Sequence, residues 1–244
     1  MQTVILAGGK GTRLFGDSAP VPKGLIEIGD RPVLWHIMKL YAHYGFDDFI
    51  VCLGYKGEAI REYFAREGRC SADSSHAGGA NWRVNFVDTG PETATGGRIK
   101  RVEQYIEGDR LFATYGDGLS DMDLNELLAY HREHGKIATL TAVRAACQFG
   151  VVRFDDDNAV TDFIEKPPLP EWINGGFCVF ERAVFDFLGE DDVLEQHTLP
   201  RLARAGELRA YPYEGAWACL DTYKDAVALN ELWDSGAAPW RVWG

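Results

Sequence analysis

Apolar positions in the first half of the chain alternate between short continuous runs and runs spaced three or four residues apart. The continuous runs predict buried strands over residues 3–7, 48–54, 83–88 and 111–115. The runs with helical spacing predict helices over residues 32–44, 58–67 and 97–106. Strands separated by helices favour right-handed crossovers. We therefore expect an α/β fold with a doubly wound, mainly parallel (Rossmann-like) sheet and helices on both faces.

The pattern changes after residue 118. Short apolar runs with brief connections predict a small addition of strands, some antiparallel, over residues 137–143, 150–154, 159–165, 175–181 and 208–213. Two further helices are predicted over residues 193–205 and 222–233. Residues 68–81 are rich in Gly, Ser and Ala, and we interpret them as a flexible excursion because no independent core follows them. A single domain over residues 1–244 is therefore predicted.

Composition narrows the range of partners. The chain has 244 residues and a formal net charge of −12. An acidic surface repels nucleic acid and anionic membranes, so we expect neither as a partner. No apolar segment approaches the ~20 residues that span a bilayer, and the N-terminus lacks the features of a signal peptide, so a cytoplasmic protein is expected. The five cysteines form no C-x-x-C pair, which argues against a disulfide framework and against a zinc site.

The segment AGGKGTRL, directly after the first predicted strand, is the first candidate for chemistry. Gly8, Gly9 and Gly11 permit a backbone that points successive N–H groups at a phosphate, and Arg13 adds donors suited to phosphate oxygens. Neither of the common nucleotide patterns, G-x-G-x-x-G and G-x-x-x-x-G-K-[ST], matches here. A tight turn that uses glycine for steric reasons alone is the alternative. Lys23 would be a second cation if the chain returns to this loop, and a solvated surface lysine if it does not.

Two other polar patterns have a plainer explanation. Asp121 and Asp123 resemble the D-x-D metal motif of glycosyltransferases, but Asp123 and Glu126 have the spacing of a capping box at a helix N-terminus. His131 and His134 lie three residues apart near a predicted helix end, where a surface role is favoured over metal binding. A glycosyltransferase is an alternative that leaves the glycine-rich loop unexplained.

Several of the candidate residues lie within longer sequence segments that resemble a known family. The chain resembles the nucleotidyltransferases that activate sugar 1-phosphates, and their glucose-1-phosphate cytidylyltransferase branch in particular. The resemblance covers nearly the whole sequence and is carried by the segments VILAGGKGTRL, IEIGDRPVLWHIMKLY, VDTG, TGGRIKRV, TYGDGLSD, INGGFCVF and LDTYKD. It implies transfer of CMP from CTP to a sugar 1-phosphate, glucose 1-phosphate above others. Pyrophosphate would be released and Mg²⁺ would be the cofactor.

The resemblance also implies roles for individual residues. Residues 1–118 would mainly bind the nucleotide, and residues 119–244 would mainly bind the acceptor and form the C-terminal helices. The nucleotide-binding residues would be Leu6, Ala7, Gly8, Gly9, Gly11, Thr12, Arg13, Lys23, Thr95, Gly96, Arg98, Asp117 and Gly118. The acceptor-binding residues would be Gly150, Glu165, Lys166, Asn174, Gly175 and Gly176.

In the same family reading, four residues would carry the catalysis: Arg13, Lys23, Asp117 and Lys166. Asp117 and Asp221 would hold Mg²⁺, which favours one or two carboxylates together with phosphate oxygens. A turn aspartate at position 117 and a helix N-cap at position 221 are the alternatives. Lys166 precedes a proline, which biases it to extended backbone and suits a side chain that projects from a loop.

The chain departs from the family pattern near the first loop and near the acceptor residues. Val21 and Gly24 stand where the family has a lysine and a proline, and the stretch before Gly150 also differs. Other phosphate or phosphonate acceptors therefore stay open, as does the use of dTTP or UTP. A non-catalytic nucleotide-sugar sensor is a further alternative. Family members often form oligomers, so we expect a homo-oligomer.

Overall fold

The computed structural model of the chain describes residues 1–9, 11, 21–66 and 82–243. The expected excursion over residues 68–81 lies outside these residues. So do Thr12 and Arg13 of the glycine-rich loop.

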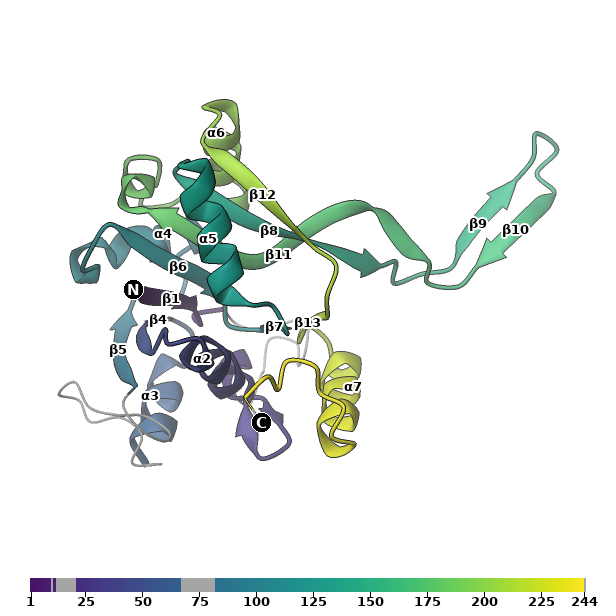
Figure 1. The fold of residues 1–244 in the computed structure, drawn as a ribbon. Coiled ribbons are helices and arrows are strands. Elements are labelled where there is room, and N and C mark those ends of the chain that lie inside the picture. Colours follow the sequence, from purple (N-terminus) through teal and green to yellow (C-terminus); the bar gives the residue numbers. More distant parts are fainter. Residues whose placement is uncertain (10, 12–20, 67–81, 244) are drawn as a thin grey trace.

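A seven-stranded sheet organises the chain, in the order β12-β8-β11-β6-β1-β4-β5 (Figure 1). Its strands are β1 (Gln2–Leu6), β4 (Asp48–Leu53), β5 (Arg83–Asp88), β6 (Arg110–Tyr115), β8 (Ala138–Ala146), β11 (Pro168–Glu181) and β12 (Leu208–Tyr213). β11 runs antiparallel to its neighbours β6 and β8, whereas the other adjacent pairs are parallel. The predicted mainly parallel sheet with an antiparallel addition is confirmed.

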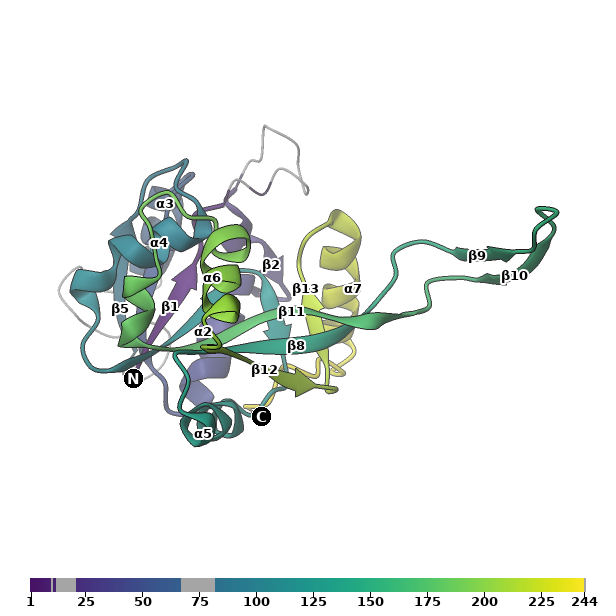
Figure 2. The ribbon, with the colours of Figure 1, turned by 90° about the horizontal axis from the view of Figure 1, so that it is seen from above.

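Helices cover both faces of this sheet (Figure 2). α2 (Val33–His43), α3 (Gly57–Arg66) and α5 (Leu124–His134) contribute to one buried cluster, and α4 (Thr95–Arg101) and α6 (Leu199–Arg204) to the other. Successive strand residues point to opposite faces. Ile5 of β1 therefore packs in the first cluster and its neighbour Val4 in the second. The helix α7 (Tyr223–Asp234) packs beside the short strand β2 (Glu27–Ile28), which pairs with β3 (Arg31–Pro32).

Two predicted helices are interrupted. The range 97–106 forms α4 followed by the 3-10 turn η3 (Glu103–Tyr105), and α4 already begins at Thr95. The range 193–205 forms a π-helical turn, η5 (Leu194–Thr198), followed by α6. Pro200 lies in the first turn of α6, where its missing N–H costs nothing, so the regular helix starts there and the wider turn precedes it.

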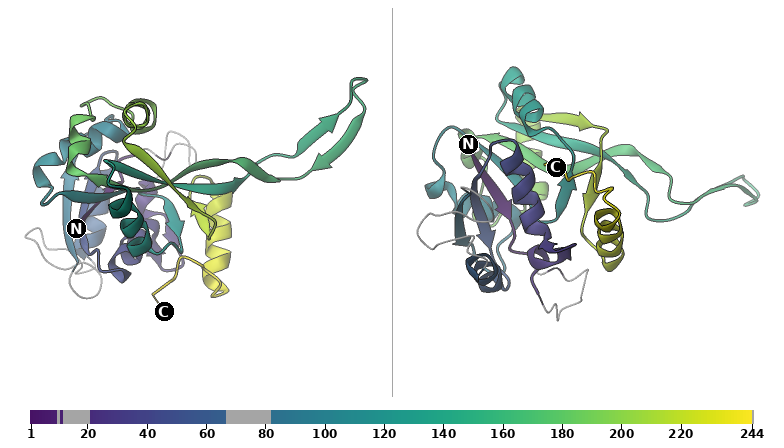
Figure 3. Two further views of the ribbon diagram at one scale, coloured as in Figure 1. Left: turned by 45° about the horizontal axis from the view of Figure 1, so that its top comes forward. Right: turned by 60° about the horizontal axis from the view of Figure 1, so that its bottom comes forward.

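The predicted strands at residues 150–154 and 159–165 form a hairpin, β9 (Val151–Phe154) and β10 (Val160–Ile164), which pairs only with itself. Figure 3 shows it as an arm that extends beyond the end of the sheet. Three of its phenylalanines are mostly exposed: Phe149, Phe154 and Phe163 at 75%, 63% and 62%. The sequence identified these strands, but an isolated two-stranded ribbon is marginally stable in water and needs an explanation.

Candidate functional site

A cavity of about 490 Å³ lies where β1 and β6 end, which we call the switch-point cavity. The chain leaves β1 towards β4 on one side and returns to β6 on the other, and ligands bind at such a reversal in open α/β sheets. Its walls come from the glycine-rich loop, η2 (Lys23–Leu25), the start of α4 and the segments after β6 and before α7. The lining residues are Leu6, Ala7, Gly8, Gly9, Gly11, Lys23, Gly24, Thr93, Ala94, Thr95, Arg98, Tyr115, Gly116, Asp117, Glu195 and Asp221.

Lys23 bridges two carboxylates in this cavity. Its Nζ lies 2.6 Å from Oδ2 of Asp117 and 2.9 Å from Oδ1 of Asp221. The three side chains are 15%, 24% and 22% exposed, so water screens them only in part. Burial alone would lower the pKa of the Lys23 ammonium, but attraction to Asp117 and hydrogen bonds to both carboxylates outweigh it and raise that pKa. Lys23 is therefore a fixed positive charge in the cavity.

Local structure explains how three residues so distant in sequence meet. Lys23 opens the turn η2, and a Cβ added at Gly11 would lie 3.3 Å from the Cβ of Lys23, so the chain does return to the glycine-rich loop. The alternative of a solvated surface lysine is wrong, because the side chain is mostly buried. Asp117 follows β6 directly, in the tight connection between β6 and β7 (Gly118–Ser120). Asp221 precedes α7, but the capping box of that helix is made by Thr222 and Asp225. Asp221 instead lines the cavity and pairs with Lys23, and the N-cap alternative is wrong.

The donor set suits a small hard cation. Among the described residues, no group of three or more His, Cys, Asp or Glu side chains is arranged to hold a metal. Asp117 and Asp221 instead present two carboxylates to one cation at the edge of an open cavity. Mg²⁺ commonly binds through one or two carboxylates and takes its remaining oxygens from phosphates and water. The pair fits Mg²⁺ delivered with a phosphate ligand.

Arg98 lies beneath the glycine-rich loop. It is 5% exposed, and its guanidinium donates to the carbonyl oxygens of Leu53, Gly90 and Gly8 at 2.9, 2.8 and 3.1 Å. Burial lowers the pKa of Arg98. A Cβ at Gly8 would come within 2.2 Å of Nη1, so a larger residue there would displace the guanidinium from these acceptors. Arg98 lines the cavity as predicted, but its donors hold the cavity wall together.

The first turn of α4 packs against the segment before η5. A Cβ at Gly96 would lie 2.8 Å from the carbonyl oxygen of Asp192, and one at Gly97 would lie 2.1 Å from that of Glu190. Gly97 N–H donates to the same Asp192 oxygen at 3.0 Å. Gly96 is buried in this contact and does not line the switch-point cavity, although the sequence reading placed it among the nucleotide residues. Thr95, one residue earlier, does line it.

A second cavity, of about 260 Å³, adjoins the first, and we call it the Trp217 cavity. It is lined by Thr114, Tyr115, Asp117, Gly118, Asn174, Gly175, Gly176, Glu195, Trp217 and Cys219. The Trp217 indole N–H donates to the carbonyl oxygen of Gly175 at 2.8 Å, which fixes one wall. Three residues line both cavities: Tyr115, Asp117 and Glu195. Asn174, Gly175 and Gly176 are thus next to the carboxylate that the sequence reading assigns to the metal.

The structure does not bring Gly150, Glu165 and Lys166 to either cavity. Glu165 and Lys166 join β10 to β11, at the base of the arm, and the Lys166 ammonium lies 3.5 Å from Oε1 of Glu165. Lys166 has a φ of +48°, so the predicted extended backbone at this residue is wrong. Among the described strands, β9 and β10 pair with each other and not with the seven-stranded sheet.

Several residues that line the cavities were not singled out from the sequence, among them Tyr115, Trp217, Cys219 and Glu195. Tyr115 is the last residue of a predicted strand, and its position at the carboxyl end could have identified it. Trp217 and Cys219 belong to β13 (Trp217–Cys219), which pairs with β7 and is too short to predict. Burial raises the pKa of the Cys219 thiol to about 12, so the thiol is neutral. Glu195 lies on the π-helical turn and carries no sequence signal.

Of the two plainer explanations offered for the aspartate and histidine motifs, the structure confirms the one for Asp123 and contradicts the one for His131. The Asp123 side chain accepts from the backbone N–H groups of Asn125 and Glu126, so its capping role is confirmed. A surface role for His131 is wrong, because this residue is fully buried. Its Nδ1 lies 2.7 Å from Thr139 Oγ1 and its Nε2 lies 3.1 Å from Glu181 Oε1. The histidine joins α5 to the sheet.

The chain is similar over most of its length to a known protein family and to known enzymes. The nucleotidyl transferase family model matches residues 2–227. The glucose-1-phosphate cytidylyltransferase of Salmonella typhi is 43% identical over the full length of both chains. A probable glucose-1-phosphate cytidylyltransferase of Bacillus subtilis is 41% identical, also over both full lengths.

The crystal structure of HddC from Yersinia pseudotuberculosis with GMP-PN superposes with a TM-score of 0.74 at 23% identity, over 95% of this chain and 99% of that chain. This likeness shows the fold. Within the described residues, none of the helices is long and apolar enough to cross a membrane. From the family match and the full-length relatives it follows that the chain belongs to the nucleotidyl transferase family.

Proposed function

We propose that this protein transfers CMP from CTP to glucose 1-phosphate, giving CDP-glucose and pyrophosphate. A phosphate oxygen of the acceptor attacks the α-phosphorus of CTP, and the bond from that phosphorus to the oxygen bridging to the β-phosphate breaks. Pyrophosphate leaves with the bonding electrons. The observation that carries the proposal is Asp117, paired with Lys23, in the wall shared by two cavities. The full-length relatives named for this reaction support the choice of substrates.

The two cavities divide the substrates between them. The switch-point cavity, built mainly from residues 1–118, would hold CTP, with Lys23 and the glycine-rich loop on its phosphates. The Trp217 cavity, to which residues 119–244 contribute most, would hold the sugar. Nucleotidyl transfer needs positioning and neutralisation of charge more than covalent help. A shared wall would place the α-phosphorus and the attacking phosphate against each other.

Mg²⁺ is the proposed cofactor, with Asp117 and Asp221 as its ligands. When bound, it would neutralise negative charge on the nucleotide phosphates. By holding the ion, Asp117 and Asp221 would determine how far the nucleotide phosphates reach into the switch-point cavity. Lys23 would turn from the carboxylates to the phosphates, which its flexible stem permits. With a nucleoside triphosphate and a sugar phosphate as substrates, we place the protein in the cytoplasm.

The exposed arm supports a homo-oligomer. Phe149, Phe154 and Phe163 are more than 60% exposed, although a ribbon of two strands cannot bury them by itself. A second copy of the chain would cover this surface. Light scattering after gel filtration should show an oligomer for the wild type and a smaller species for the Phe154→Gln/Phe163→Gln variant. A monomeric wild type would contradict the proposal.

The roles of Glu165 and Lys166 at the acceptor can be tested through the same arm. For these residues to reach the Trp217 cavity, the arm must move or a neighbouring copy must supply it. Equal mixtures of Lys166→Ala and Asp117→Asn chains, refolded together, distinguish the two cases. Restored turnover would mean that the residues act across chains, and no restoration would favour movement within one chain. Unchanged kinetics of Lys166→Ala alone would remove Lys166 from the site.

A substrate matrix tests the reaction itself. CTP, UTP, dTTP, ATP and GTP are each incubated with a panel of sugar phosphates and phosphonates, and pyrophosphate release is measured with Mg²⁺ and with EDTA. The expected result is release with CTP and glucose 1-phosphate that EDTA abolishes. Preference for UTP or dTTP would overturn the base, and preference for another acceptor would overturn the sugar. Tight nucleotide binding in calorimetry without release from any pair would indicate a sensor and refute the enzyme.

A further inference from the structure

A chain of hydrogen bonds crosses the wall between the two cavities. The N–H of Gly176 donates to Asn174 Oδ1 at 2.8 Å, and Asn174 Nδ2 donates to the Tyr115 hydroxyl at 3.2 Å. Tyr115 donates in turn to Oε1 of Glu195. From the other side, Thr95 Oγ1 donates to Oε2 of Glu195 at 2.8 Å. The chain converges on one carboxylate that lines both cavities.

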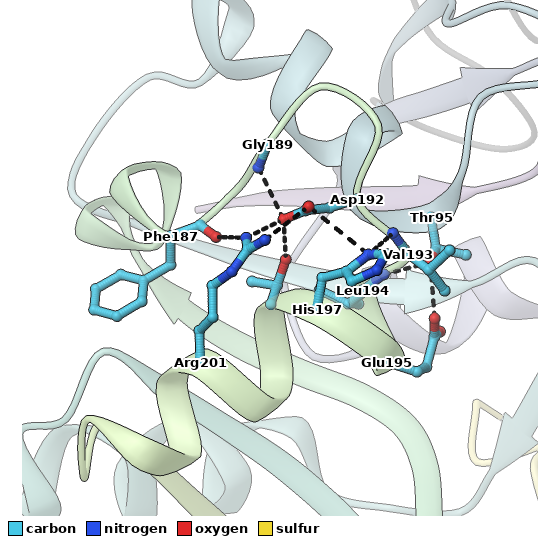
Figure 4. A network of polar contacts seen from close by, with 10 residues as sticks. Thr95, Phe187, Gly189, Asp192, Val193, Leu194, Glu195, His197 and Arg201 are labelled. Carbon is cyan, nitrogen blue, oxygen red and sulfur yellow. Dashed lines mark hydrogen bonds and ion pairs between the residues drawn. The ribbon is translucent and has the colours of Figure 1, made fainter.

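The backbone that carries Glu195 is firmly held, as Figure 4 shows. The N–H of Leu194 donates to Thr95 Oγ1 at 2.9 Å, which ties the π-helical turn to α4. Asp192, 8% exposed, accepts from Gly189 N–H at 2.9 Å and pairs with the guanidinium of Arg201. Hydrogen bonds from Arg201 lower the pKa of Asp192, so the pair stays charged. The Glu195 carboxylate is thus positioned before any substrate arrives.

A carboxylate is an unexpected group in a cavity built for phosphates, because it repels them. Among the residues that the structure describes, no cation pairs with Glu195, and its two hydrogen-bond donors, Tyr115 and Thr95, are neutral hydroxyls. An ionised carboxylate offers about four acceptor positions, of which these donors use two. The remaining positions suit an uncharged donor on the substrate. Hydroxyl groups are the uncharged donors that a nucleotide and a sugar phosphate both carry, whereas the amino group of cytosine belongs to the nucleotide alone.

We propose that Glu195 is a specificity-determining residue that accepts a hydrogen bond from a substrate hydroxyl. This inference rests on the proposed function. The hydroxyl belongs either to the ribose of the nucleotide, in the switch-point cavity, or to the sugar ring of the acceptor, in the Trp217 cavity. Both sources share the same chemistry, and loss of the matching hydroxyl should weaken the substrate in the same way as loss of the carboxylate.

The experiment compares the wild type with Glu195→Gln and Glu195→Ala. One arm measures kcat/KM for CTP and for 2′-deoxy-CTP and 3′-deoxy-CTP. The other arm measures kcat/KM for glucose 1-phosphate and for its analogues that lack one ring hydroxyl. A hydrogen bond to a charged group is worth about tenfold to a hundredfold in kcat/KM. The wild type should discriminate by this factor against one deoxy analogue, and Glu195→Ala should treat that analogue and the full substrate alike.

Two control variants distinguish recognition of a substrate hydroxyl by Glu195 from effects on the position of Glu195. Glu190→Gln changes a carboxylate five residues away that pairs with Arg101 and lines neither cavity, so its kinetics should match the wild type. Thr95→Val loosens Glu195 without removing it, and should lower kcat/KM for full and deoxy substrates together. Circular dichroism and thermal melts of each variant establish that it is folded.

The outcomes are distinct. Loss of discrimination against a deoxynucleotide assigns the hydroxyl to the ribose, and loss against a deoxysugar assigns it to the acceptor. A uniform decrease across all substrates, or no change, overturns the inference while the proposed function stands. If the wild type releases no pyrophosphate from any pair, the proposed function fails. Calorimetric binding of the same nucleotides and sugar phosphates to wild type and Glu195→Ala then decides whether a hydroxyl is recognised.

Discussion

Replacing Lys23 with methionine removes a charge that pairs with both Asp117 and Asp221. The side-chain stem keeps a similar length, so the change acts mainly on the ammonium 2.6 Å from Asp117 and 2.9 Å from Asp221. Without that cation both carboxylates lose an ion pair in a partly buried site. We expect the variant to be less stable without metal, to bind divalent cations more tightly without nucleotide, and to lose turnover.

The magnitude follows from burial and charge. Two opposite charges about 4 Å apart attract by about 4 kcal/mol at an effective dielectric constant of about 20. Removing one partner from a fully buried pair costs about 3–5 kcal/mol. Because Asp117 and Asp221 are 24% and 22% exposed, water recovers part of this loss. We expect a net loss of about 2–3 kcal/mol, which lowers Tm by about 5–10 °C in a chain of this size.

Direct metal binding is the more specific measurement. Titration of Mn²⁺, followed by the electron paramagnetic resonance signal of the free ion, gives the Kd without any reaction. In the wild type the ion competes with Lys23 for the same carboxylates, so Lys23→Met should bind Mn²⁺ at least about tenfold more tightly when nucleotide is absent. Mn²⁺ should also raise the Tm of the variant more than that of the wild type, because a ligand stabilises the state that binds it.

A matched control is Lys136→Met. Lys136 pairs with Glu207 at 3.1 Å and lines neither cavity. It should change Tm less and leave the Mn²⁺ affinity as it is. Equal Tm and equal Mn²⁺ affinity for Lys23→Met and wild type would refute the reasoning, because Lys23 would then hold neither carboxylate.

Three further predictions follow from single residues. Asp117→Asn should stay folded by circular dichroism but keep less than about a tenth of the turnover, since metal-assisted charge stabilisation is worth several kcal/mol. Burial lowers the pKa of His131 and His134 below the unfolded value of about 6.5, so folding stability is present above that pH and is lost as pH falls through it. Denaturant unfolding should give a smaller free energy at about pH 5.5 than at about pH 7.5, with a flatter dependence in His131→Gln. Arg98→Lys should lower Tm and raise KM for the nucleotide, because an ammonium cannot reach the carbonyls that the guanidinium holds; equal values for both proteins would contradict this.

The periodicity of the chain was enough to define the layers of the fold. Continuous runs gave β1, β4, β5 and β6, helical spacing gave α2 and α3, and the order of strand and helix required a parallel sheet. These are local properties, since each run is buried on the faces that its own period selects. The glycine-rich loop after the first strand was equally visible, because glycine permits close approach wherever it stands.

The arm is a part of the fold whose position hydrophobic periodicity does not predict. The strands β9 and β10 were predicted correctly, yet their alternation gives no information about which surface they pack against. In the structure they leave the sheet, and Glu165 and Lys166 go with them. The family resemblance placed these residues at the acceptor, but tertiary contacts decide whether they reach it. Pairing partners are set by topology and by neighbouring surfaces, neither of which a strand pattern contains.

The order of apolar and polar residues was sufficient to define the sheet, the helices on its faces and the residue types available for phosphate chemistry. The position of Lys23 between Asp117 and Asp221, about a hundred and two hundred residues away, became visible in the folded chain. So did the position of Glu195 between two cavities on a π-helical turn. The physical reason is that secondary structure follows from interactions within a few residues. A site of this kind depends instead on where the carboxyl ends of separate strands and the ends of separate helices come together.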